Sequence, residues 1–256
     1  MNRFSKVVLT SSLLFSLNIS VAVASEFEAV GEKLKVAMQA SIRGEADTKR
    51  DHNRLPAQTL KFFGLRDDMT VIELIPGGGW YTKLLAPILA DKGKLYVALG
   101  SGNVEKNLLD KDGFSNVSVL AADARMGKKP GARLYFLEVS EFGINDADMV
   151  LTFRNYHNFD RAGRMAMNNA AYAALKPGGV YALVDHTQRH MEGDTPENAR
   201  RFDPVTAILE IQEAGFVLEA SSDLHYRPDD ELRYEVGRKS VTGNTDRWTL
   251  KFRKPE

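Results

Sequence analysis

The chain has 256 residues, of which 43% are hydrophobic and 27% are charged, so it can bury one substantial core. Its 34 basic residues equal its 34 acidic residues, and without a basic excess we expect no nucleic-acid partner. It has no cysteine, which excludes a disulfide framework and a lipid-carrying thiol.

Residues 1–24 predict a cleavable signal peptide. Arg3 and Lys6 precede an apolar stretch from Val7 to Val23, and Ala22-Val23-Ala24 provides the small-residue cleavage pattern. The polar residues in the stretch argue against an uncleaved membrane anchor. We therefore expect a periplasmic or secreted protein with no stable membrane anchor after cleavage. It would carry 32 basic against 34 acidic residues, since Arg3 and Lys6 are removed.

Residues 25–63 predict an N-terminal helical extension to a single domain whose core spans 64–256. Apolar residues recur every three or four positions from Glu26 to Ala40, as in an amphipathic helix. The polar run from Ser41 to Arg54 favours a solvated loop, and the alternative is a lid that brings charge over a site. Pro56 is expected to start a short helix that ends near Gly64.

The segment from Val71 to Thr82 predicts a buried strand that runs into a tight turn. Pro76 and the glycines Gly77, Gly78 and Gly79 follow the apolar run, and glycine lets a ligand approach the main chain. The composition from Tyr81 to Ala90 is helical, so the turn would present free N–H groups. A strand, glycine turn and helix open a nucleotide-type site in a doubly wound α/β sheet.

Strands and helices alternate through the rest of the chain. We expect strands at 94–99, 117–120, 147–152, 180–184, 215–220 and 247–252, and helices at 103–109, 160–175 and 204–214. The connection 124–145 is read as irregular, and the final strand, which alternates apolar and polar residues, as an edge strand. The pattern predicts a mostly parallel seven-stranded sheet with helices on both faces.

Ligands in such sheets bind beyond the carboxyl ends of the strands. That rule selects the segments Glu73–Tyr81, Leu99–Ser101, Asp123, Phe153–His157 and Asp185–His190.

These segments resemble the class I S-adenosylmethionine (SAM) dependent methyltransferases. The resemblance lies in the Glu73–Gly79 turn, in Asp123, and in the Leu175-Lys176-Pro177-Gly178-Gly179 turn before the fifth strand. It covers roughly 54–253 and looks closest to predicted exported methyltransferase-like proteins. Those proteins pair a signal peptide with an Arg-Asn-x-His element, here Arg154 to His157, and with a Thr-Asp-Arg element, here Thr245 to Arg247.

The resemblance implies SAM as the cofactor, a Rossmann-like methyltransferase fold and a small-molecule methyl acceptor. It implies that SAM binds to nine residues: Glu73, Pro76, Gly77, Gly78, Gly79, Tyr81, Gly100, Asp123 and Arg154. Two positions depart from the family pattern: Ile75 replaces a usual glycine, and Leu99-Gly100-Ser101 lacks the usual ribose-binding acid. A nicotinamide dehydrogenase fits less well, because Pro-Gly-Gly-Gly is not its glycine motif.

Methyl transfer requires alignment of two reactants and removal of a proton where the acceptor carries one. His157 is the candidate base, with a packed or capping histidine as the alternative. Asn155 would orient the acceptor or the SAM amino group. Arg154 would bind an acidic substrate or pair with Asp148 or Asp160. No metal is expected, because the four-residue spacing of His186 and His190 needs a helix that the sequence does not predict.

Two functions remain open from the sequence. The first is a SAM-dependent methyltransferase that acts on a small molecule. The second is a non-catalytic exported ligand-binding or assembly protein that retains the fold. The glycine turn and the Arg154–His157 element favour the enzyme. The missing ribose acid and the export signal favour the alternative, because SAM is charged and is made in the cytoplasm.

Overall fold

A computed structural model describes residues 27–121 and 123–256. The predicted signal peptide lies outside these residues. Within them, no helix has both the length and the apolar character needed to cross a membrane.

The protein is built around a seven-stranded sheet in the order β3-β2-β1-β6-β7-β9-β8. The strands are β1 (Thr70–Leu74), β2 (Lys94–Ala98), β3 (Val117–Leu120), β6 (Ala147–Phe153), β7 (Leu175–His186), β8 (Val217–Ser222) and β9 (Arg247–Arg253). The first five run parallel, and β9 is antiparallel to both of its neighbours. The doubly wound, mostly parallel α/β fold is confirmed.

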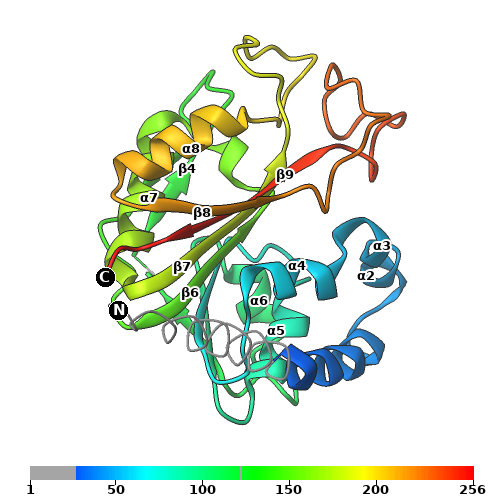
Figure 1. The fold of residues 1–256 in the computed structure, drawn as a ribbon, viewed down its shortest axis with the longest axis vertical. Coiled ribbons are helices and arrows are strands. Elements are labelled where there is room, and N and C mark those ends of the chain that lie inside the picture. The colour runs from blue at the N-terminus through cyan, green and yellow to red at the C-terminus, as the bar shows by residue number, and fades with distance from the viewer. Residues whose placement is uncertain (1–26, 122) are drawn as a thin grey trace, which may run out of the picture.

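Helices cover both faces of the sheet (Figure 1). One face carries α4 (Pro56–Phe63), α5 (Thr82–Leu89) and α6 (Gly102–Asn107), and the other carries α7 (Arg161–Ala174) and α8 (Pro204–Glu213). Each face has its own buried apolar cluster. Asp160 caps α7 by accepting a hydrogen bond from the Gly163 N–H at 2.8 Å.

The position of β9 corrects one prediction. β9 lies between β7 and β8 and pairs with both, so it is not an edge strand; β8 forms the edge. Its first four residues are buried on both faces of the sheet. The polar alternation was misleading since Arg247 and Thr249 are buried among polar partners.

The polar segment before α4 corrects a second prediction. It forms α2 (Glu45–Thr48) and α3 (Asp51–Arg54) and is not a solvated loop, because Arg43, Asp47 and Arg54 are buried. The preceding helix spans 27–39 and packs through Val30 and Leu34 onto the α5 face.

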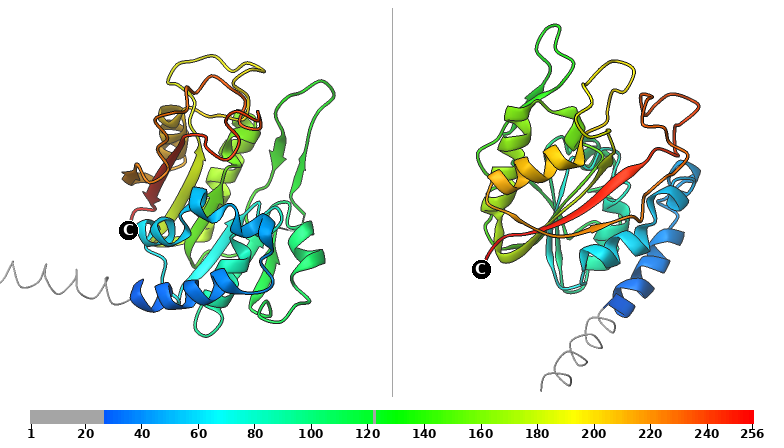
Figure 2. Two further views of the ribbon diagram at one scale, coloured as in Figure 1. Left: turned by 90° about the vertical axis from the view of Figure 1, so that its right-hand side faces the viewer. Right: turned by 45° about the horizontal axis from the view of Figure 1, so that its top comes forward.

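Two further differences concern the strands. The connection 124–145 contains a hairpin, β4 (Arg125–Gly127) with β5 (Phe136–Glu138), which projects beside the sheet (Figure 2). Strand β7 begins at Leu175, since Leu175 pairs with Ala147 across a register shift, so the Lys176–Gly179 turn is a bulge within the strand.

Candidate functional site

A cavity of about 380 Å³ opens where β1, β6 and β7 end. Its walls come from the turn after β1, from the loop after β6, from His186, and from Arg50 and Arg54 of the α2–α3 segment. It brings together eight predicted site residues: Glu73, Pro76, Gly77, Gly78, Tyr81, Arg154, Asn155 and His157. The carboxyl ends of parallel strands meet at one edge of the sheet, which explains this convergence.

The glycine turn has two open positions and one packed position. A Cβ at Gly77 or Gly78 would meet no atom within 4 Å, so the main chain there is exposed to the cavity. A Cβ at Gly79 would lie 2.4 Å from Leu108 Cδ1, so Gly79 serves the packing of α6 and does not line the cavity. Asn155 steadies the turn by donating from Nδ2 to the Ile75 carbonyl at 3.2 Å.

Glu73 is a buried acid at the base of this cavity. Its Oε2 accepts a hydrogen bond from Thr82 Oγ1 at 2.6 Å. Burial raises the pKa of Glu73 from 4.5 to about 7, although the Thr82 hydrogen bond and the Arg54 charge act in the opposite direction. This carboxyl can therefore bind a ligand as either a donor or an acceptor near neutral pH.

His157 and Asp185 form a buried pair beside the glycine turn. His157 Nδ1 lies 2.6 Å from Asp185 Oδ1, and the His157 N–H donates to Asp185 Oδ2 at 3.0 Å. Because a carboxylate only accepts, the Nδ1 atom carries the proton and Nε2 is left as the basic atom. Both a general base and a histidine that packs under the loop can have this pairing with Asp185.

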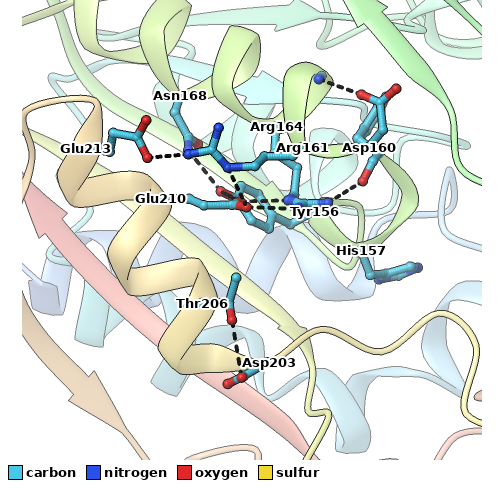
Figure 3. A network of polar contacts seen from close by, with 12 residues as sticks. Tyr156, His157, Asp160, Arg161, Arg164, Asn168, Asp203, Thr206, Glu210 and Glu213 are labelled. Atoms are coloured by element: carbon cyan, nitrogen blue, oxygen red, sulfur yellow. Dashed lines mark hydrogen bonds and ion pairs between the residues drawn. The ribbon is translucent and has the colours of Figure 1, made fainter. Parts of the chain in front are cut away.

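A polar network holds the loop after β6, which carries Tyr156 and His157, in position (Figure 3). Tyr156 donates to Glu210 Oε2 at 3.1 Å, and Arg164 holds both Glu210 oxygens at 2.7 and 2.8 Å. Asn168 donates to the Tyr156 hydroxyl at 2.9 Å. In Figure 3 the His157 ring points away from this network, so α7 and α8 anchor the turn while His157 faces the cavity.

Arg154 takes neither of the two pairings that the sequence offered. Asp148 binds Lys176 and the Thr70 N–H, and Asp160 caps α7. Arg154 has a φ of 61°, and its own N–H donates to the Val184 carbonyl at 2.7 Å. The Arg154 side chain lines the cavity.

Besides Gly79, two further predicted cofactor residues lie outside the main cavity. Gly100 lines a separate hollow of about 260 Å³, together with Ser101 and Glu105. Asp123 is exposed and lines a third hollow near Glu138. The structure therefore does not place Glu73 and Asp123 around one space.

His186, the last residue of β7, and His190, which follows the strand, lie in different environments. His186 is buried, lines the cavity and bonds Thr245 Oγ1 through Nδ1 at 2.8 Å. His190 is exposed and pairs with Asp203 at 2.8 Å. Trp80 and Tyr81 are mostly buried, and both border the cavity.

Sequence reasoning missed the roles of Arg54, Asp185 and Glu105. Arg54 reaches the cavity from the segment that the sequence favoured as a loop. Asp185 follows the predicted strand 180–184, as His157 follows the predicted strand 147–152, and that shared position was the signal for their pairing. Glu105 lies within α6 and accepts a hydrogen bond from Ser101 Oγ at 2.5 Å, so the nearest acid to the hollow after β2 stands on this helix.

No protein-family model and no curated protein matches the chain. Solved structures do match it. A SAM-dependent methyltransferase from Aquifex aeolicus is 19% identical with a TM-score of 0.57, over 80% of this chain and 93% of that chain. The glycopeptide N-methyltransferase MtfA, solved with sinefungin, is 14% identical with a TM-score of 0.50, over 80% and 87%.

A third match carries a different reaction in its name. The [4+2]-cyclase SpnF is 13% identical with a TM-score of 0.50, over 79% of this chain and 80% of that chain. Identities this low establish the architecture, and the reaction must be argued from the site. By its sheet order and these neighbours, the chain has the fold of the class I SAM-dependent methyltransferases.

Proposed function

We propose that the protein is a SAM-dependent methyltransferase that acts on a small molecule. One observation carries the proposal: the open main chain of Gly77 and Gly78 and the Asp185-oriented ring of His157 line the same cavity. A cofactor turn and a base are the two parts that methyl transfer to a protonated acceptor requires.

The residues present fit SAM at its methionine end. Gly77 and Gly78 would accept close approach because no Cβ stands in the way, and Glu73 would face the ligand from the cavity floor. Ser101 and Glu105 would provide polar groups for the ribose from the hollow after β2. When bound, SAM supplies a methyl group on a sulfonium that an aligned nucleophile can accept.

His157 would take the proton that the acceptor loses. Its Nε2 is the basic atom, because Nδ1 donates to Asp185. The Asp185 carboxylate would then stabilise the imidazolium that forms, and its second oxygen, bound to the His157 N–H, keeps the turn in place. Asn155 holds the glycine turn through the Ile75 carbonyl and so sets the distance between turn and base.

The second candidate is a ligand-binding protein that retains the fold without catalysis. The separation of Gly100 and Asp123 from the main cavity favours it, because an adenosyl group would need to reach two further hollows. The SpnF match, which is named as a [4+2]-cyclase, is consistent with this candidate, because one fold can carry different functions.

Calorimetry with SAM on the purified protein distinguishes the two candidates. We expect micromolar affinity, about −8 kcal/mol, and an equal affinity for His157→Ala, since His157 serves the proton and not the cofactor. With a panel of small hydroxyl- and amino-bearing acids, His157→Ala should form S-adenosylhomocysteine about 10²–10⁴-fold more slowly.

His190→Ala is the matched control, because that histidine is exposed and outside the cavity, and it should keep both properties. The absence of heat at millimolar SAM would remove the enzyme. Equal turnover in His157→Ala would dismiss His157 as the base.

A further inference from the structure

Three arginines converge on one point in the wall of the main cavity. Arg54 from the end of α3, Arg154 from the loop after β6 and Arg247 from the start of β9 line a small cavity of about 10 Å³. Arg54 and Arg154 also line the main cavity, so the two spaces adjoin. The smaller space has room for about one water-sized group, such as one ligand oxygen.

These guanidinium groups have no carboxylate partner among residues 27–121 and 123–256. The other two arginines of the main cavity do: Arg50 pairs with Asp47 at 2.9 Å, and Arg200 pairs with Glu235. Only 5% of Arg54 and 6% of Arg247 is exposed. Within the same described residues, the Nε atoms of both are buried without a hydrogen-bond acceptor. Buried donors are normally satisfied, so a missing acceptor is indicated.

The remaining contacts do not neutralise the cluster. The Arg54 guanidinium lies 4.3 Å from the Trp80 ring centroid, and Arg247 donates to the Asn53 carbonyl at 2.6 Å. Burial and then the neighbouring Arg154 lower the pKa of Arg54 to about 8, and the same causes lower the pKa of Arg247 to about 10. Like charges held together away from water oppose folding unless an anion joins them.

We propose that Arg54, Arg154 and Arg247 bind an oxyanion of the methyl acceptor, either a carboxylate or a phosphate monoester. One anion oxygen would occupy the small cavity, and the rest of the acceptor would extend into the main cavity toward His157. The assignment to the acceptor rests on the proposed function, whereas the anion site itself does not.

The position of Arg247 favours the acceptor over the carboxylate of SAM. Arg247 begins β9, which the sheet order separates from β1 by β6 and β7, while the glycine turn and the hollow with Gly100 lie at β1 and β2. Arg247 therefore places one end of the cluster on the β9 side of the cavity, away from the glycine turn, while Arg54 lies over Trp80 beside that turn. His157, on the loop between the two sides, can face both.

Thermal melting at matched ionic strength tests the anion site without SAM. Inorganic phosphate or benzoate should raise the melting temperature of the wild type relative to chloride. Arg54→Gln and Arg247→Gln should abolish that increase, with binding weaker by about tenfold or more in calorimetry. Both variants should melt at or above the wild-type temperature in chloride, because removal of an unpaired buried charge relieves repulsion. Arg66→Gln, at a partly exposed arginine that pairs with Asp68, is the control and should retain the increase.

The possible results of this experiment have the following consequences for the anion site. If neither anion stabilises the wild type, or if the Gln variants keep the increase, the anion site is wrong. If Arg54→Gln does not fold, Arg247→Gln and Arg54→Lys carry the same comparison. If only one of the two anions raises the melting temperature, phosphate indicates a phosphate monoester as the acceptor group and benzoate indicates a carboxylate.

A second titration separates this inference from the proposed function. At saturating SAM the anion should still bind with similar or higher affinity, because the two would occupy different sides of the cavity. Competition between SAM and the anion would assign the arginines to the cofactor carboxylate and overturn the acceptor assignment. Anion binding without any SAM binding would overturn the methyltransferase and leave an anion site.

Discussion

Glu73 and His157 line one cavity, but only His157 is hydrogen-bonded to a group that can carry the opposite charge. His157 has a buried carboxylate partner in Asp185, so a positive charge on its ring would be compensated. Glu73 has a hydroxyl donor in Thr82 and no cation bonded to it among the described residues. Burial therefore opposes the ionised form of Glu73 and raises its pKa.

Stability should report the Glu73 pKa. The native carboxyl keeps a proton that the unfolded chain loses near pH 4.5, so its contribution is full below pH 4.5 and is lost as pH rises to about 7. Glu73→Gln should therefore raise the free energy of unfolding at about pH 8 by up to about 3 kcal/mol, and by much less at about pH 5. Urea denaturation at both pH values measures the difference. Glu105→Gln, an exposed acid, serves as the control, and a pH-independent effect of Glu73→Gln would contradict the raised pKa.

Much of the site could be predicted at the residue scale because each residue follows a strand. His157, Asn155, Gly77 and Gly78 were placed correctly at the cavity by that rule alone. The pairing of His157 with Asp185 could not be predicted, because it depends on the register in which Phe153 lies beside Val184. The arginine cluster could not be predicted either, since it joins three segments far apart in the sequence.

At the scale of elements, the three consecutive glycines of the turn have different tasks. Gly79 has a φ of +76° and is packed under Leu108 and Val104 of the α6 region. Gly78 faces open space, and its backbone does not need the left-handed conformation. One residue type thus serves helix packing at one position and ligand approach at another.

Alanine at these two positions should separate stability from binding. Gly79→Ala should lower the free energy of unfolding by about 2–4 kcal/mol, because the new Cβ clashes with Leu108 and the positive φ is strained. Gly78→Ala should change stability by less than about 0.5 kcal/mol but weaken SAM binding, since its methyl group enters the cavity. Urea denaturation and calorimetry on both variants measure the two effects. A stable Gly79→Ala, or unchanged SAM affinity in Gly78→Ala, would contradict the assigned tasks.

The elements that the sequence predicted correctly are those with a strong local pattern. The strands β1, β2, β3, β6 and β7 and the helices α4, α5, α7 and α8 follow from apolar runs and caps. The interior position of β9 could not be predicted, because strand order is decided by packing and not by the strand's own residues. The α2–α3 segment was misread since its charged residues find partners only in the folded chain, as Arg43 does in Asp51.

At the scale of the whole molecule, the N-terminal segment and the loops near β9 meet over the carboxyl ends of the strands (Figure 1). The Arg54 carbonyl accepts from His225 Nε2 at 3.1 Å, and Arg247 donates to the Asn53 carbonyl. Trp80 Nε1 donates to the Asp47 carbonyl at 2.9 Å. The α2–α3 segment is thus hydrogen-bonded both to the glycine-turn region and to the C-terminal part of the chain. Arg50 and Arg54 of this segment line the cavity.

Asp47 is the main polar anchor of this segment. Its carboxylate binds Lys83 of α5 at 2.7 Å and Arg50 at 2.9 Å, and both Asp47 and Lys83 are largely buried. Asp47→Ala should leave Lys83 unpaired, and the loss of a charge-assisted bond of about 1.5–3 kcal/mol should let the segment open about tenfold or more often. Hydrogen exchange of the amides in 45–54 measures this opening.

The same segment offers a matched control in Glu45→Ala. Glu45 pairs with Lys49, but both side chains are highly exposed, and such pairs contribute little to stability. The amides in 45–54 should therefore exchange at nearly the wild-type rate in Glu45→Ala and faster in Asp47→Ala, while those of β1 and β6 stay protected in both. Arg54 is the last residue of α3, so opening of the segment would move Arg54 away from the anion site, and Asp47→Ala should also weaken anion binding. If the two variants exchange alike, or if faster exchange leaves anion binding unchanged, the segment does not hold Arg54 at the cavity through Asp47.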